Sequence, residues 1–105
     1  MKRKLGLLLS LPPSDSSVVT VQRLAQTALE AQYDVYLYLI DEGVKNVHDP
    51  RYIALAQSGV KVFACAYGCQ QHRVSTKNLD PNVSLCGLVI LSGIIDACEP
   101  FLAFT

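Results

Sequence analysis

The stretch "VYLYLIDEGVKNVHDPRYIALAQSGVKVFAC", residues 35–65, decides the fold. It begins with a run of branched and aromatic residues, which is typical of a β-strand. Asp49 and Pro50 then form a helix cap followed by proline at the first helical position, and Gly59 is a typical helix end. The run "VKVFAC" that follows is a second strand. A strand, a helix and another strand predict a βαβ unit with a right-handed crossover and parallel strands.

The flanking segments continue this alternation. Residues 5–11 are nearly all apolar, as expected for a strand that is covered on both faces. From Val18 to Leu29 the apolar residues fall on one face of a helix. Residues 83–98 suit a strand by their branched side chains and a buried helix by their length, and residues 101–105 suit a short last strand. The sequence therefore predicts an α/β fold, a three-layer αβα sandwich around a mainly parallel sheet of four to five strands.

Composition narrows the class of protein. The 105 residues predict one domain that spans residues 1–105, and a hydrophobic content of 50% is too high for a disordered chain. Nine basic and nine acidic residues give a formal charge of +0, so nothing in the charge favours nucleic acid or anionic lipid. No apolar run approaches the roughly 18 residues of a membrane span. The apolar run near the start is too short for a signal peptide and ends at two prolines, so we expect a cytoplasmic protein with reduced cysteines.

Chemistry in a parallel sheet gathers beyond the carboxyl ends of the strands. We expect three segments at this edge, "PPSDSS" (12–17), "DEG" (41–43) and "CAYGC" (65–69). Cys65 ends the third strand, and Cys69 follows one helical turn later. A helix that begins near Gly68 would direct backbone N–H groups toward Cys65 and favour a thiolate, the form that attacks sulfane sulfur.

Other thiol sites fit less well. A thioredoxin-like pair needs two intervening residues, whereas three separate Cys65 from Cys69. A phosphatase-type loop needs a spacing of cysteine to arginine that neither cysteine has with Arg73. Zinc would need Cys65, Cys69 and His72 together with His48, and no second metal-spaced pair supports it, so we predict no metal.

Plain packing remains the alternative for several of these residues. Cys86 and Cys98 lie within apolar segments, and we interpret them as core residues. His72 fits a solvated helix position, and Tyr67 fits either packing or a pocket wall. The hydroxyls of "LSLPPSDSS" (9–17) are candidates to bind a phosphate, although this loop has no glycine and Asp15 would repel an anion. This leaves a second hypothesis, a non-catalytic module that binds a small ligand or nucleotide or serves as an assembly subunit.

Two segments carry a resemblance to a known family, "VKVFACAYGCQQHRV" (60–74) and "VSLCGLVILSGIIDACEPFLAF" (83–104). The chain resembles the DsrE/DsrF-like family, which includes sulfur-relay proteins, over nearly its whole length. Members carry a reactive cysteine at the end of the third strand, several residues before a turn of Arg-Gly-Ile/Val type. That cysteine falls on Cys65, and Arg73-Val74 occupies the turn. The family segment Gly-Leu-x-x-Leu matches Gly87, Leu88 and Leu91.

The resemblance implies a flavodoxin-like parallel sheet, a helix at roughly Cys86 to Ala97, and a homo-oligomer, commonly a trimer or hexamer. It also implies a persulfide carrier in which Cys65 accepts sulfane sulfur from a donor protein and passes it to an acceptor protein, without a cofactor. Whether the chain is itself a sulfurtransferase stays open, and Cys69 is a candidate to resolve the persulfide. The predicted catalytic residues are Cys65 and Cys69, and the predicted binding residues are Ser14, Ser16, Tyr67, Gly68 and Arg73.

Overall fold

Five parallel strands form a single sheet in the order β4-β3-β2-β1-β5 in the computed structural model, which describes residues 2–105. The α/β fold predicted from the sequence is confirmed, with five strands. The elements are β1 (Lys4–Leu9), α1 (Ser17–Glu30), β2 (Asp34–Leu39), the 3-10 helix η1 (Asp41–His48), α2 (Pro50–Gln57), β3 (Lys61–Cys65), α3 (Ala66–Gln71), β4 (Val83–Cys86), α4 (Leu88–Ala97) and β5 (Phe101–Phe104).

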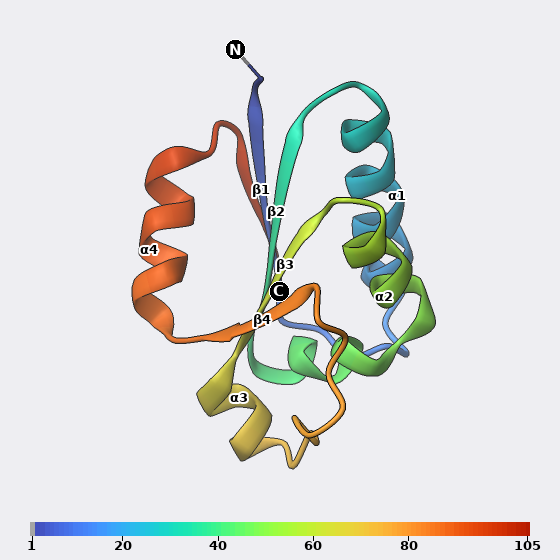
Figure 1. Ribbon diagram of the computed structural model, residues 1–105, viewed down its shortest axis with the longest axis vertical. Coiled ribbons are helices and arrows are strands. Elements are labelled where there is room, and N and C mark those ends of the chain that lie inside the picture. Colours follow the sequence, from blue (N-terminus) through green and yellow to red (C-terminus); the bar gives the residue numbers. More distant parts are fainter. Residues whose placement is uncertain (1) are drawn as a thin grey trace.

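The direction of each crossover decides which face a helix covers. The chain steps from β1 to β4 in one direction across the sheet, and its right-handed connections put α1 and α2 on one face. The connection from β4 to β5 runs back across the sheet to the far side of β1, so α4 lies on the opposite face. Figure 1 shows α1 and α2 on the right, α4 alone on the left and α3 below the carboxyl ends of the strands. The sheet is therefore covered by two helices on one face and one on the other.

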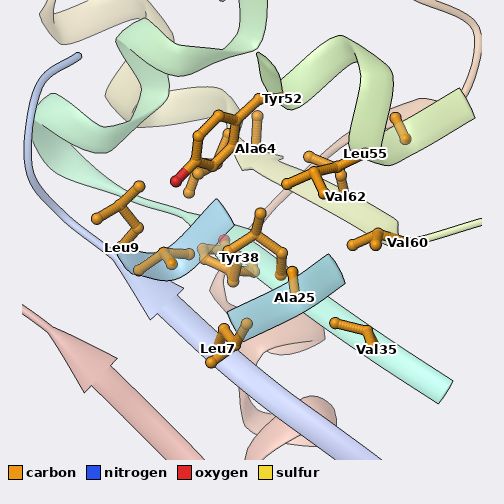
Figure 2. Close-up of a cluster of buried hydrophobic side chains, with 14 of the residues drawn as sticks. Leu7, Leu9, Ala25, Val35, Tyr38, Tyr52, Leu55, Val60, Val62 and Ala64 are labelled. Atoms are coloured by element: carbon orange, nitrogen blue, oxygen red, sulfur yellow. The ribbon is translucent and has the colours of Figure 1, made fainter. Parts of the chain in front are cut away.

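The main core lies between the sheet and the pair α1 and α2. Leu7, Leu37 and Leu39 are fully buried here, and the apolar stripe of α1 packs on them through residues such as Val21. Figure 2 shows side chains from β1, β2 and β3 converging with Tyr52 of α2. The Tyr52 hydroxyl donates to the carbonyl oxygen of Val18 at 2.7 Å, which ties α2 to the start of α1.

The α4 face is covered more thinly. Tyr36 and Phe63 stack on it with ring centroids 6.5 Å apart, and both remain half-buried. On α4 itself, Leu88 is 60% exposed and Val89 is 84% exposed. A long apolar surface of this kind is unusual on a lone chain.

Two segments differ from the sequence predictions. Residues 83–98 contain both of the alternatives, the strand β4 up to Cys86 and the helix α4 from Leu88, so the helix begins later than the resemblance implied. The segment after β2 forms η1, which the sequence did not predict. Gly43 lies so close to the Leu9 carbonyl that a Cβ atom would collide with it, so η1 is pressed against the end of β1. None of the helices formed by residues 2–105 has the length and hydropathy of a membrane span.

Candidate functional site

Cys65 stands where β3 ends and α3 begins. It is the N-cap of α3, and the backbone N–H of Gly68 donates to its Sγ at 3.4 Å. The helix starts at Ala66, two residues before the predicted point. The residue is only 3% exposed, yet its sulfur has a polar donor.

A pocket of about 300 Å³ opens beside Cys65 at the carboxyl edge of the sheet. Tyr67, which is 71% exposed, stands at its rim. Two of the three segments expected at this edge, "DEG" and "CAYGC", contribute to it. The residues that line it are Ile40, Asp41, Cys65, Tyr67, Gly68, Gln71 and His72. Cys65 is thus buried next to a cleft rather than sealed in the core.

A hydrogen bond between His72 and Asp41 forms one wall of this pocket. The Nε2 atom of His72 donates to Oδ1 of Asp41 at 2.7 Å. Asp41 has a φ of 53°, a left-handed conformation that aspartate tolerates better than most residues. The side chain of His72 is only 22% exposed, so it is more enclosed than the solvated position expected from the sequence.

Gly68 allows the two walls of the pocket to approach each other. A Cβ atom at this position would lie 3.0 Å from Cγ1 of Val44 and 3.4 Å from the backbone nitrogen of Asp41. A side chain here would therefore push η1 away from α3, and with it Asp41 away from His72. The predicted binding residue Gly68 has a structural reason to be glycine.

Cys69 lies behind the pocket. It is 1% exposed and does not line the cavity beside Cys65. Burial raises the pKa of its thiol, and nearby Cys65 raises it further. Cys69 is therefore near Cys65 but enclosed, and its thiol ionises less readily than that of a free cysteine.

Cys86, which the sequence analysis assigned to the core, packs against the core and lies beside Cys65, outside the lining of the pocket. In the parallel ladder between β3 and β4, Cys86 pairs directly with Cys65, so both strands end in a cysteine at the same level. Cys86 is half-buried. A signal was present in the sequence, because "VFAC" (62–65) and "VSLC" (83–86) have the same pattern and the carboxyl ends of parallel strands meet at one edge.

Tyr38 lies near the thiols of both Cys65 and Cys86. Its fully buried hydroxyl donates to the carbonyl oxygen of Gly87 at 3.0 Å. Burial raises the pKa of this hydroxyl far above its ordinary value, and Cys86 and Cys65 raise it further. Burial likewise raises the pKa of Cys86, while the nearby Tyr38 hydroxyl lowers it by less. We call Cys65, Cys86 and Tyr38 the dithiol cluster.

Three predicted binding residues lie outside the pocket beside Cys65. Ser14 and Ser16 are exposed in the loop before α1, and Ser16 occupies the N-cap position without a side-chain hydrogen bond. Oδ1 of Asp15 instead accepts the backbone N–H of Ser17 at 2.8 Å, which leaves a carboxylate where a phosphate would have to bind. Arg73 is exposed, with a φ of 56° that is typical of glycine. The structure thus gathers Cys65, Tyr67 and Gly68, but not Ser14, Ser16 or Arg73.

The zinc arrangement considered from the sequence does not form. In the part of the chain from residue 2 to residue 105, no group of three His, Cys, Asp or Glu side chains is placed to hold a metal ion. His48 is hydrogen-bonded through Nε2 to the carbonyl oxygen of Ser75 at 2.7 Å, while His72 is held by Asp41. The two histidines are thus engaged with other partners.

A five-stranded parallel sheet with a cysteine at the carboxyl end of its third strand defines a class of small α/β proteins with a thiol at the sheet edge. The chain belongs to the DsrE/DsrF-like family, whose model matches residues 3–104. The resemblance found in the sequence is therefore confirmed.

Two solved structures share the fold. The first, the ychN protein of E. coli, has a TM-score of 0.83 at 20% identity, with 99% of this chain and 100% of that chain covered. The second, MTH1491 of Methanobacterium thermoautotrophicum, a protein of unknown function, has a TM-score of 0.73 at 14% identity, with 99% and 98% covered. The comparison with curated proteins gives no match. At these identities the two structures support the fold alone.

Proposed function

We propose that this protein is a persulfide-carrying sulfur-relay protein in which Cys65 takes up sulfane sulfur from a donor and passes it to an acceptor. One observation carries the proposal, the position of Cys65 at the end of β3, with its sulfur bonded to the Gly68 amide and a pocket beside it. Membership of the DsrE/DsrF-like family supports the same role.

The transfer step uses groups in the pocket. The Cys65 thiolate attacks the outer sulfur of a donor persulfide, a new S–S bond forms on Cys65, and the donor leaves as a thiolate with the electron pair of the broken bond. The Gly68 N–H favours negative charge on the attacking sulfur. His72, held by Asp41, is the pocket group that can protonate the leaving thiolate. The reverse of this step delivers the sulfur to an acceptor thiol.

Burial suits the loaded state. Cys65 is 3% exposed, so a persulfide on it would be shielded from most solvent oxidants. A pocket of about 300 Å³ admits a small persulfide or the cysteine of a protruding loop on a protein partner. We therefore propose sulfur donor and acceptor proteins as partners, and the cytoplasm, where the thiols stay reduced, as the place of action.

We also propose that copies of this chain assemble through the α4 face, as trimers or hexamers. Four large hydrophobic residues of α4 are exposed, and they are Leu88, Val89, Ile90 and Ile95. Asp96 is the only charged residue within α4. Burial of this surface in an oligomer would remove apolar area from water, which favours association.

The second candidate function is a non-catalytic assembly subunit of the same fold, and the apolar α4 face favours it. It needs no reactive thiol, and the burial of Cys65, Cys69 and Cys98 fits it as well. Nucleotide binding at the loop before α1 has less support, because the Asp15 carboxylate occupies the start of the helix. A melting temperature that rises with added nucleotide would support a binding module instead.

A short pulse of inorganic polysulfide, quenched with acid, tests the relay. Trypsin should cut after Lys61, Arg73 and Lys77, so Cys65 and Cys69 share one peptide, whereas Cys86 and Cys98 share another. We expect a gain of about 32 Da on the peptide of residues 62–73. The gain should persist in Cys69→Ser and in the control Cys98→Ser and vanish in Cys65→Ser. A gain that survives Cys65→Ser, or none in any variant, would exclude the proposed relay.

A further inference from the structure

We propose that Cys86 is the resolving thiol of this site, which discharges a persulfide on Cys65 as hydrosulfide and closes a Cys65–Cys86 disulfide across the ends of β3 and β4. This inference rests on the proposed loading of Cys65. It assigns a catalytic role to a residue that lies 21 positions further along the chain.

The register of the sheet provides the geometry. Cys65 and Cys86 are partners in the parallel ladder and the last residues of their strands. Neighbouring strands lie about 4.8 Å apart. The Cα atoms of a disulfide are usually about 4.4–6.8 Å apart. Paired residues of adjacent strands also point to the same face. The bond therefore needs only a small adjustment at the strand ends, where the ladder stops.

Tyr38 holds the junction on which this bond would form. Its hydroxyl donates to the carbonyl oxygen of Gly87, the residue after Cys86, and so fixes the end of β4 against β2. Both thiols interact with the same hydroxyl. The Tyr38 hydroxyl lies near the Cys86 thiol and opposes part of the effect of burial on the pKa of that thiol. The three groups are thus mutual neighbours in a buried setting.

Cys69 is the competing candidate for the resolving role. It is nearer to Cys65 in sequence but is 1% exposed on the buried side of α3, and it does not share the strand register. Cys86 is half-buried, so a reducing thiol can reach the disulfide and regenerate the site. The structure therefore favours Cys86 over Cys69.

The step balances without an outside oxidant. The Cys86 thiolate attacks Sγ of the Cys65 persulfide, the bond from Sγ to the outer sulfur breaks, and the outer sulfur leaves as hydrosulfide with the electron pair. The outer sulfur is reduced to sulfide, and Cys86 is oxidised to the disulfide level. A cellular dithiol then reduces the disulfide by exchange and restores both thiols.

A chase after the polysulfide pulse tests this step. Excess donor is removed, and samples are taken over time for free sulfide and for non-reducing tryptic maps. In the wild type and in Cys69→Ser, the gain of about 32 Da should decay to a loss of about 2 Da relative to the reduced protein, with one equivalent of sulfide released. The disulfide should link the peptides of residues 62–73 and 78–105.

Cys86→Ser, with Cys86→Ala as a second variant, should load in the pulse and keep its persulfide through the chase. Cys98→Ser is the matched control, since it removes a cysteine from the same peptide and should discharge like the wild type. If the persulfide lasts as long in the wild type as in both Cys86 variants, Cys86 is not the resolving thiol, although the relay stays intact. Discharge lost in Cys69→Ser but kept in Cys86→Ser would also overturn the role of Cys86. An absence of any loading in the pulse would instead refute the relay.

Discussion

The two faces of the sheet use the same five strands but differ in what covers them. On the α1–α2 face, residues such as Leu7 and Leu37 are fully buried beneath two helices. On the α4 face, Leu8 and Tyr36 are half-buried under a single helix that is itself largely exposed. The dithiol cluster belongs to this second face, at its carboxyl edge.

The two faces of the sheet therefore contribute differently to stability and to thiol chemistry. Successive side chains of a strand point to opposite faces of the sheet, so a single strand contributes residues to both faces. The α1–α2 face, which we call the closed face, removes most of its apolar area from water and so stabilises the fold. The α4 face, which we call the open face, leaves Cys86 half-buried and several apolar side chains of α4 exposed. We infer that substitutions on the closed face change stability, while those on the open face change assembly or thiol reactivity.

Neighbouring leucines on β1 give the largest expected effect. Leu7→Ala, on the closed face, should lower the free energy of unfolding by about 3 kcal/mol, since it leaves a cavity in a fully buried site. Leu8→Ala, on the open face, should cost about half as much. Urea denaturation at low protein concentration measures both. Equal losses would show that the two faces are packed alike.

The next largest effect concerns assembly. Val89→Asp adds a charge at a position that is 84% exposed, so the fold should keep its stability. Association should weaken by about 30-fold or more, because a charge would be buried in an apolar interface. Gln26→Asp, at an exposed position of α1, is the control. If sedimentation velocity gives the same oligomer for Val89→Asp and for wild type, α4 is not the interface.

The fold could be predicted from the sequence because its signals are local. The Asp49-Pro50 start of α2 and the apolar run of β1 need no tertiary information. Cys86 and His72 could not be placed in the same way. Cys86 enters the site through pairing between β3 and β4, and His72 through Asp41, which comes from a segment 31 positions away. Both depend on how distant segments align, which one sequence does not reveal unless the similar strand ends "VFAC" and "VSLC" are compared.

The rate at which Cys86 releases sulfide from the Cys65 persulfide should depend on pH, and this tests the thiol chemistry of the open face. Burial holds the pKa of Cys86 above its ordinary value, so its thiolate is scarce at neutral pH. Below that pKa the thiolate fraction rises about tenfold per pH unit. The rate of sulfide release in the chase should therefore climb steeply between about pH 7 and pH 9. Rates that stay flat over this range would mean that Cys86 does not attack as a thiolate.

The smallest expected effect is a loss of stability at low pH, and it concerns α2 on the closed face. Asp49 caps α2, and hydrogen bonds from the Arg51 side chain hold its pKa below the ordinary value. Its contribution is therefore complete above the unfolded pKa of about 3.9 and is lost as pH falls through the lower folded pKa. Asp49→Ala should cost about 1 kcal/mol at neutral pH.

Asp49→Asn is the matched variant. Asparagine caps a helix about as well as aspartate, so Asp49→Asn should keep much of the stability at neutral pH. Its stability should lack the part that depends on the ionisation of the Asp49 carboxylate. Thermal melts from about pH 2 to pH 7 compare the three proteins. A constant difference between wild type and Asp49→Ala down to the lowest pH would contradict the role of the Asp49 charge.

The most direct test of the central claim removes the discharge step and asks where sulfur binds. Intact-mass spectra of Cys86→Ser after equimolar polysulfide should show a gain of about 32 Da. The double variant Cys65→Ser/Cys86→Ser should stay at its unmodified mass, although it retains Cys69 and Cys98. Equal sulfur uptake by the two proteins would contradict the assignment of Cys65 as the sulfur-carrying residue.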